Sequence, residues 1–266
     1  MRYTQKDVCK AFDIKRDTLR HYERMGIIEP EIDPNNGYRY YDDWQINLLW
    51  DAKRYQAMGF SLAEVRDILH GDSLLDVQAR VGQRESDLQE ELAYLEKRIS
   101  MIGSYRALLD SVDDHLGAYV LEESPAVRFV PRREMHDLLL GDQLTASGAF
   151  ANAHQALSIP CAHFPSISDE LYYWGFAMLE DWYDELGGPD EGSMTLPAGP
   201  ALTTCVDAGE RWGFGLHLFD GLVAEARRLG KEPLGMLCGY LLTRTYDKDG
   251  GYHRYVEAML PLKADK

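Results

Sequence analysis

Apolar side chains recur at every seventh position along one stretch of the chain. The first set is Leu74, Val81, Leu88, Leu95, Ile102 and Leu109, and the second seam position holds Leu92 and Ile99. This spacing is typical of a long helix that buries one stripe of side chains against another helix. Gln78, Glu85 and Arg106 interrupt the stripe, so the seam is strongest over residues 88–102. We therefore expect residues 72–116 to form a coiled-coil dimerisation helix; the alternative is a long helix that packs only within its own subunit.

The length of the chain leaves room for a domain on each side of this helix. The 266 residues are 45% hydrophobic and 27% charged, as in a folded globular protein. No run of about 18 apolar residues is present, and the first residues carry charges where a signal peptide has its apolar segment. We expect a cytoplasmic protein that does not span a membrane.

The net charge of −16 is distributed unevenly along the chain. Residues 1–70 hold 11 basic and 12 acidic side chains, whereas residues 117–266 hold 12 basic and 22 acidic ones. The N-terminal part can therefore approach a polyanion, while the C-terminal part repels anions and attracts cations. Most of the aromatic side chains also lie in the C-terminal part.

Residues 1–25 have the pattern of two short helices joined by a tight turn. Thr4 and Asp7 form a capping box ahead of apolar residues at helical spacing, and Asp13 marks the end of that helix. The second helix, at about residues 15–25, is basic on the face formed by Lys15, Arg16, Arg20 and Arg24. A helix-turn-helix presents such a second helix to the major groove of DNA. The alternative is an ordinary solvated helix face.

A hairpin and two more helices complete this part of the chain. Asn36 and Gly37 supply the positive φ angles of a tight turn, and the strand formers that follow are Tyr38, Tyr40 and Tyr41. Arg39 would lie beside the sugar-phosphate backbone in such a wing. Helix caps follow at Asp42 and, as a second capping box, at Ser61 and Glu64. We expect residues 1–71 to form a winged helix-turn-helix DNA-binding domain.

The segments TLRHYERMGIIEP and NGYRYYDDWQINLLW resemble the winged helix-turn-helix of the MerR family of transcription regulators. The resemblance implies a dimer that binds a palindromic promoter and activates RNA polymerase by distorting the DNA. It also implies that the long helix pairs antiparallel with its mate. The candidate DNA-binding residues are Lys15, Arg16, Thr18, Arg20 and Tyr22 in the helix and Tyr38 and Arg39 in the wing. For Tyr22, packing in the core is an equal alternative, since tyrosine has an apolar body and a polar tip.

Two positions depart from the pattern of the MerR family. His21 stands where a tyrosine is common, and Glu31 and Ile32 follow Pro30 where an arginine is frequent. The missing arginine removes one expected phosphate contact in each subunit.

The cysteines argue against a metal or redox sensor. Cys9, Cys161, Cys205 and Cys238 are scattered without a short pair, so they are poor candidates for disulfides or a zinc site. MerR proteins that sense soft metals place thiolates at the end of the long helix, where this chain has only His115. We expect no metal site and no cofactor.

Residues 117–266 have the pattern of an α+β domain with antiparallel strands. Strands are expected at residues 127–133, 171–183 and 201–206, and helices near residues 142–157 and 214–229. The segment DKDGG predicts a hairpin that joins two long strands at residues 234–247 and 251–262.

This domain is similar to the gyrase-inhibitor-like effector-binding fold. The similarity rests on VRFVPRRE, TLPAGPALTTCVDAG, the turn at residues 230–233 and the terminal YVEAMLPL. Joined to a MerR head, such a domain in the multidrug-sensing subgroup binds bulky cationic, aromatic drugs against tyrosines and a buried glutamate. A carboxylate beside aromatic rings attracts organic cations by charge and by cation–π contacts. Cys238 replaces the usual glutamate ahead of Tyr240, so Glu257 becomes the leading anionic candidate.

The candidate ligand-binding residues are Tyr172, Trp174, Trp212, Cys238, Tyr240, Tyr255 and Glu257. Each aromatic residue could instead pack in the core, and Glu257 could instead pair with Arg244 or Arg254 at the surface. A further group of acids is expected to form a solvated rim that steers cations inward: Glu180, Asp181, Asp184, Glu185, Asp190 and Glu191.

The sequence thus predicts a homodimeric transcription activator that senses a lipophilic, cationic compound and has no catalytic residues. One alternative is a regulator of the same architecture that responds to a neutral metabolite or a protein. The other is a hydrolase of small strained substrates, although the chain has no G-x-S-x-G, HExxH, Walker or dinucleotide-binding motif.

Overall fold

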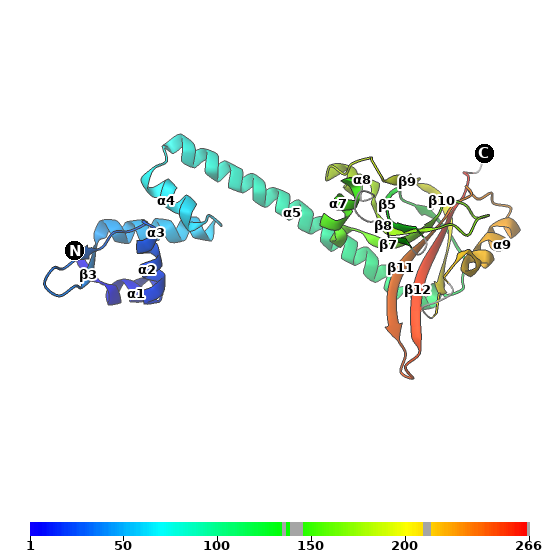
Figure 1. Ribbon diagram of the computed structural model, residues 1–266, viewed down its shortest axis with the longest axis horizontal. Coiled ribbons are helices and arrows are strands. Elements are labelled where there is room, and N and C mark those ends of the chain that lie inside the picture. The colour runs from blue at the N-terminus through cyan, green and yellow to red at the C-terminus, as the bar shows by residue number, and fades with distance from the viewer. Residues whose placement is uncertain (135–136, 139–145, 210–213, 265–266) are drawn as a thin grey trace. The chain divides into compact units, whose positions relative to one another are not determined.

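The computed structural model describes residues 1–134, 137–138, 146–209 and 214–264. The chain divides into two compact units, Met1–Ala93 and Tyr94–Lys266. Helix α5 (Leu74–Asp110) begins in the first unit and ends in the second. Figure 1 shows the small helical unit in blue and the large sheet of the second unit in green to red.

The first unit is a winged helix-turn-helix, as the sequence predicts. Its helices are α1 (Gln5–Phe12), α2 (Arg16–Arg24), α3 (Asp43–Ala57) and α4 (Leu62–His70). Its strands are β1 (Arg2–Thr4), β2 (Glu31–Ile32) and β3 (Arg39–Asp42), and they form an antiparallel sheet in the order β1-β3-β2. Strand β1 was not expected from the sequence. The core includes Leu19, Ile27, Tyr41, Leu49 and Val65, all fully buried.

Local sequence signals set where these helices begin and end and where the wing turns. Thr4 and Asp7 form the capping box of α1, and Asp13 adopts a left-handed conformation with φ of 51° at its end. Gly37 has φ of 70° in the turn of the wing, a conformation that glycine adopts without strain. Ser61 and Glu64 form the capping box of α4. The hydrogen bonds of the two capping boxes fix the first turns of α1 and α4.

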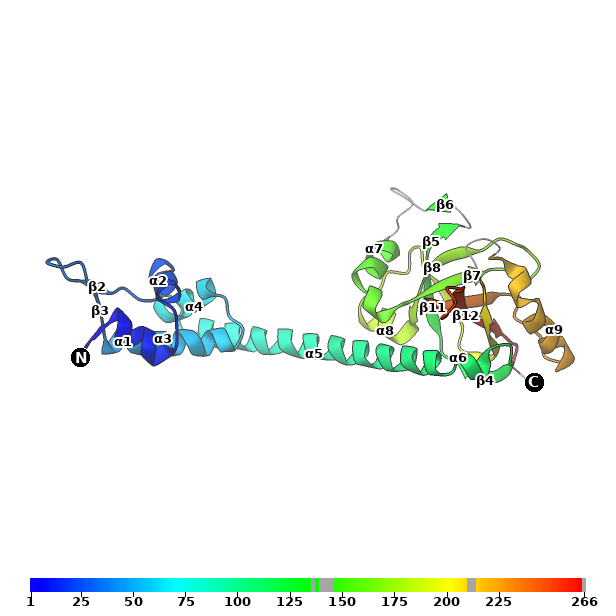
Figure 2. The same ribbon diagram turned by 90° about the horizontal axis from the view of Figure 1, so that it is seen from below.

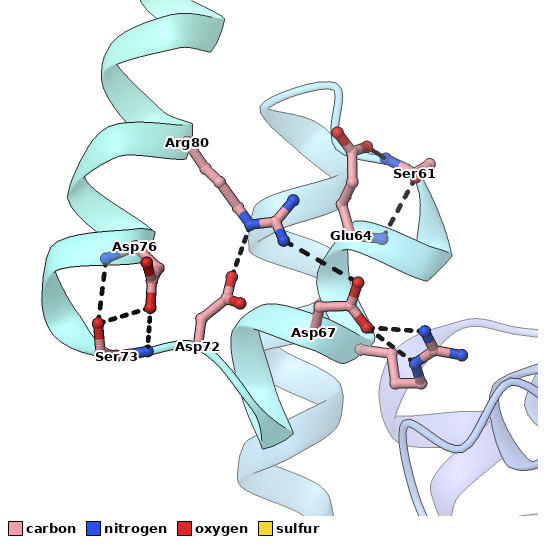
Figure 3. Close-up of polar contacts among 8 residues, drawn as sticks. Ser61, Glu64, Asp67, Asp72, Ser73, Asp76 and Arg80 are labelled. Carbon is pink, nitrogen blue, oxygen red and sulfur yellow. Dashed lines mark hydrogen bonds and ion pairs between the residues drawn. The ribbon is translucent and has the colours of Figure 1, made fainter.

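An ion-pair network fixes the join between α4 and α5 (Figure 3). Arg80 donates from Nε to Asp72 Oδ2 at 2.6 Å, and its Nη2 lies 4.0 Å from Asp67 Oδ2. Ser73 and Asp76 exchange hydrogen bonds at the first turn of α5, like the capping box of α4. The chain therefore reverses at Asp72 with its polar groups satisfied.

Helix α5 has 37 residues and none of its side chains is buried. The heptad residues Leu88, Leu92, Leu95, Ile99 and Ile102 are 40–70% exposed. Within the described residues, no helix is long and apolar enough to cross a membrane. Among the described residues, the stripe is thus an apolar face that remains largely exposed.

The second unit is built on an antiparallel sheet. Its strands are β4 (Val120–Ser124), β5 (Val127–Glu134), β6 (Asp137–Leu138), β7 (Ile159–Phe164), β8 (Tyr173–Leu179), β9 (Met194–Leu196), β10 (Gly199–Asp207), β11 (Leu237–Tyr246) and β12 (Tyr252–Pro261). Among the described residues, their order is β4-β10-β12-β11-β7-β8-β5-β6, with β9 beside β5. Figure 1 shows β11 and β12 as a long hairpin. The α+β fold and the hairpin agree with the sequence prediction.

Short helices surround this sheet. They are α6 (Val112–His115), α7 (Ala146–Ala153), α8 (Glu180–Glu185) and α9 (Asp220–Arg228), with 3-10 turns at Gln155–Leu157 and Leu216–Phe219. The prediction of one strand over residues 171–183 is wrong, because the strand ends at Leu179 and helix α8 follows. Glu180 and Asp181 lie in the first turn of α8, where negative charge favours a helix.

The two faces of the sheet have separate cores. One face packs Phe164, Leu202 and Val256 with Leu222 of α9. The other face carries Cys161, Tyr240 and Met259 and meets the last turns of α5, which lead into α6 and β4 as Figure 2 shows. Tyr105 of α5 donates a hydrogen bond from its hydroxyl to the carbonyl of Leu242 on this second face.

Candidate functional site

The basic residues of α2 form an exposed surface on the first unit. Lys15 precedes the helix in an extended conformation, and Arg16, Thr18 and Arg20 follow it with exposed side chains. Leu19 packs on the opposite side of the helix and is fully buried. The helix therefore turns its apolar side to the core and its cationic side to solvent, as a groove-reading helix requires.

The carboxylate of Glu23 on α2 links this helix to the wing. Arg39 Nε and Glu23 Oε2 are 3.1 Å apart, and the Tyr41 hydroxyl donates to Glu23 at 2.5 Å. The pKa of the buried Tyr41 hydroxyl is raised by burial and then by Glu23. Tyr38 is 65% exposed at the turn of the wing. The Arg39 side chain is thus engaged in an ion pair within the domain, whereas the exposed Tyr38 side chain is free to contact another molecule.

Tyr22 does not join this exposed surface. Its side chain is 5% exposed, and its hydroxyl donates to Gln56 of α3. Of the two roles that the sequence left open, the structure supports core packing, because the hydroxyl already has a partner inside the domain.

A cavity of about 470 Å³ lies in the second unit, between the last turns of α5 and the sheet. Its lining is mainly apolar and aromatic, with a few polar groups, which is the usual character of a small-molecule site. The lining residues of a type that can interact with a cation or an aromatic ring are Tyr105, His115, Glu122, Glu123, Trp182, Tyr240 and Glu257.

Glu257 is partly buried in this cavity. It faces Tyr240 across β11 and β12 and Cys205 across β10 and β12. Burial, and after it the negative charge of Glu122, raises the pKa of Glu257 to about 7. In the part of the chain that the structure describes, no hydrogen bond or ion pair joins Glu257 to a cation, so the surface pairing with Arg244 or Arg254 is absent. The carboxylate is available to a ligand.

The other predicted ligand residues divide between two faces of the sheet. Trp174 of β8 pairs with Ala162 of β7. Tyr240 of β11 pairs with Cys161, the residue before Ala162 on β7. Since successive side chains of a strand point to opposite faces, Trp174 lies on the face away from Tyr240 and Glu257. Tyr172, just before β8, also packs on that far face, 5.5 Å from the ring of Phe214. The prediction that Tyr172 and Trp174 share one site with Glu257 is wrong; both belong to the core beneath α9.

Two further candidates, Cys238 and Tyr255, do not line the cavity. Cys238 is fully buried, with its Sγ 3.6 Å from Nδ1 of His163. Tyr255 shares the face of Glu257 but stacks on His253, with 5.9 Å between the ring centroids. Trp212 lies outside the described residues. Cys238 therefore does not replace the missing glutamate as a ligand contact.

Part of the expected acidic rim is neutralised. Arg128 lies 3.2 Å from Glu180, 3.8 Å from Asp184 and 3.0 Å from Asp190. Lys97 makes an ion pair with Glu185 at 2.5 Å. These acids stabilise the fold around α8, and their steering of cations is correspondingly weaker.

Comparison with known proteins identifies the first unit. Residues 3–72 match the family model described as MerR HTH family regulatory protein. Residues 3–72 form a MerR-type helix-turn-helix domain. A regulator of multidrug-efflux transporter 2 from Bacillus subtilis is 27% identical over 112 residues, which are 41% of this chain and 37% of that protein. The transcriptional regulator ZntR of Escherichia coli is 26% identical over 113 residues, which are 42% of this chain and 79% of ZntR.

A solved structure of EcmrR bound to DNA aligns with 99% of this chain and 100% of that chain, at 14% identity and a TM-score of 0.39. The names of these relatives describe regulators and not enzymes. The Bacillus protein matches this chain over little more than a third of its own length.

Sequence reasoning did not place several of these cavity residues in the ligand site: Tyr105, His115, Glu122, Glu123 and Trp182. Trp182 was assigned to a strand, and the acids at the start of α8 were the signal that it lies on a helix. Glu122 lies on β4, a strand whose exposed side chains give little alternation of apolar and polar residues. No described group of three or more His, Cys, Asp or Glu side chains could hold a metal ion.

Proposed function

We propose that the protein is a dimeric, DNA-binding transcription regulator whose C-terminal unit binds lipophilic organic cations. The DNA-binding part rests on the MerR-type domain and its exposed face of Lys15, Arg16, Thr18 and Arg20. Positive side chains at this place would hold phosphates, and the tip of the wing at Tyr38 would lie beside the backbone. Promoter distortion and action on RNA polymerase are the mode that the MerR resemblance implies.

The dimer is proposed to form through α5. Its exposed stripe from Leu88 to Ile102 requires a second helix to remove it from water, and a second copy of the same helix supplies the complementary stripe. A two-fold dimer also matches the two halves of a palindromic DNA site.

Selection from a random library of DNA duplexes tests the DNA-binding part. The full chain, immobilised and incubated with the library, should enrich an inverted repeat. The matched control is the variant Arg20→Ala, which keeps the fold but loses one cation of the exposed face. Failure of the full chain to enrich any sequence would overturn the assignment as a sequence-specific regulator.

The cation-binding part is carried by Glu257. An unpaired carboxylate in a cavity with Trp182 and Tyr240 favours an organic cation over an anion or a neutral body. Quenching of tryptophan fluorescence by tetraphenylphosphonium tests whether the cavity binds a cation. Neutral triphenylphosphine oxide is the comparison compound. The variant Trp182→Phe removes the tryptophan of the cavity and should abolish its quenching.

Saturable quenching by the cation alone supports the proposal. Equal binding of the neutral compound would favour the alternative of a regulator for a neutral metabolite. Turnover of the bound compound would favour the hydrolase alternative.

A further inference from the structure

Two carboxylates on one face of the sheet line the same cavity at different depths, and the neighbouring Glu123 also belongs to the lining. Glu257 on β12 is partly buried, and Glu122 on the edge strand β4 is exposed. Strand β10 lies between them: Thr203 pairs with Met259 on one side and with Val120 on the other. Directly paired residues and residues two apart point to the same face of a sheet, so Glu122 and Glu257 share one face. Both line the cavity.

The cavity provides no fixed cation for either carboxylate. Among its described lining residues there is no lysine or arginine, and His115 is the one histidine. The other groups that face Glu257 or line the cavity with it carry no cation: Tyr105 on α5, Cys205 on β10, Tyr240 on β11, and Glu122 and Glu123 on β4. Two like charges in a partly desolvated site repel each other.

A ligand with one positive charge can neutralise only one of these carboxylates. A ligand with two separated positive centres can neutralise both, and the apolar lining formed by Leu179, Trp182 and Met259 suits the body that joins them. We propose that the cavity selects organic dications, with one centre held by Glu257 inside and the other by Glu122 at the mouth. This inference rests on the proposed function of the same cavity as a cation site.

The probes are bis(trimethylammonium)alkanes of increasing chain length and alkyltrimethylammonium ions with the same chains. Calorimetric titration of the full-length protein compares each dication with its monocation. We expect the dication of best-fitting length to bind at least about tenfold more tightly than its monocation, the gain that one added ion pair of about 1.4 kcal/mol provides.

Substitution of Glu122, the carboxylate at the mouth of the cavity, tests whether this residue causes the preference for dications. Glu122→Gln should reduce the ratio of dication to monocation affinity to about twofold, while the monocation affinity changes little. Glu232→Gln is the control, because it removes an exposed carboxylate that does not line the cavity and should leave the ratio unchanged. Glu257→Gln should weaken both ligand series.

The outcomes separate the two proposals. Monocations that bind as tightly as dications of every length would overturn the two-centre site and leave the cation site intact. A preference for dications that survives Glu122→Gln would also overturn it. Failure of both series to bind would overturn the cation site itself and this inference with it.

Discussion

Arg39 of the wing and Glu23 of helix α2 form an ion pair, with 3.1 Å between Nε and Oε2. The same carboxylate accepts the hydrogen bond of the buried Tyr41 hydroxyl. Glu23 is 13% exposed in its side chain, so it is shielded from water. One acidic residue thus joins the two elements that would contact DNA, and it sets their relative position.

We expect Glu23→Ala to lower the free energy of unfolding by about 1–3 kcal/mol, because the buried Tyr41 hydroxyl loses its acceptor. Urea unfolding of the full chain, followed by circular dichroism, measures the change. Glu31→Ala is the control, since Glu31 pairs with Arg2 at an exposed position and such pairs contribute about 0–1 kcal/mol. Equal losses in the two variants would contradict the role of Glu23.

We expect Arg20→Ala to weaken binding to the selected DNA site and to reduce the slope of log affinity against log salt by about one if Arg20 contacts a phosphate. Fluorescence anisotropy with labelled duplex at several salt concentrations gives both quantities. Arg228→Ala removes an exposed arginine of the C-terminal unit and should change neither. An unchanged affinity in Arg20→Ala would remove this residue from the DNA-binding surface.

Local signals explain why the first unit could be predicted from the sequence. The capping boxes at Thr4 and Ser61 and the turn at Gly37 depend on residues within a few positions of one another. The burial of Tyr22 could not be predicted from the sequence, because its hydroxyl is hydrogen-bonded to Gln56 of α3, which lies far along the chain.

The ligand cavity could be predicted only in part, because it depends on strand register. Glu257 and Tyr240, both predicted from the sequence, line the cavity together because β11 and β12 pair in a hairpin. Trp174 was misplaced because its face is set by pairing with β7, a strand that the sequence did not reveal. Glu122 was missed because β4 joins the sheet by pairing with the distant β10.

We expect Leu95→Glu to convert the dimer to a monomer, because it places a charge in the centre of the apolar stripe of α5. Sedimentation equilibrium measures the mass. Glu90→Lys changes the charge on the same helix away from the stripe and should leave the dimer intact. A dimeric Leu95→Glu protein would show that another surface holds the subunits together.

We expect the stability of the second unit to fall as pH rises from about 4.5 to about 7, through the titration of Glu257. Its pKa is raised in the folded protein to about 7 by burial and by Glu122, so the folded state holds a proton that the unfolded chain has already released. The stabilisation is therefore complete below the unfolded pKa and is lost as pH approaches the folded pKa. Glu257→Gln should remove this pH dependence, whereas Glu232→Gln, at an exposed ion pair with Lys263, should keep it. Urea unfolding across this pH range measures the effect. A slope that persists unchanged in Glu257→Gln would assign the titration to another group.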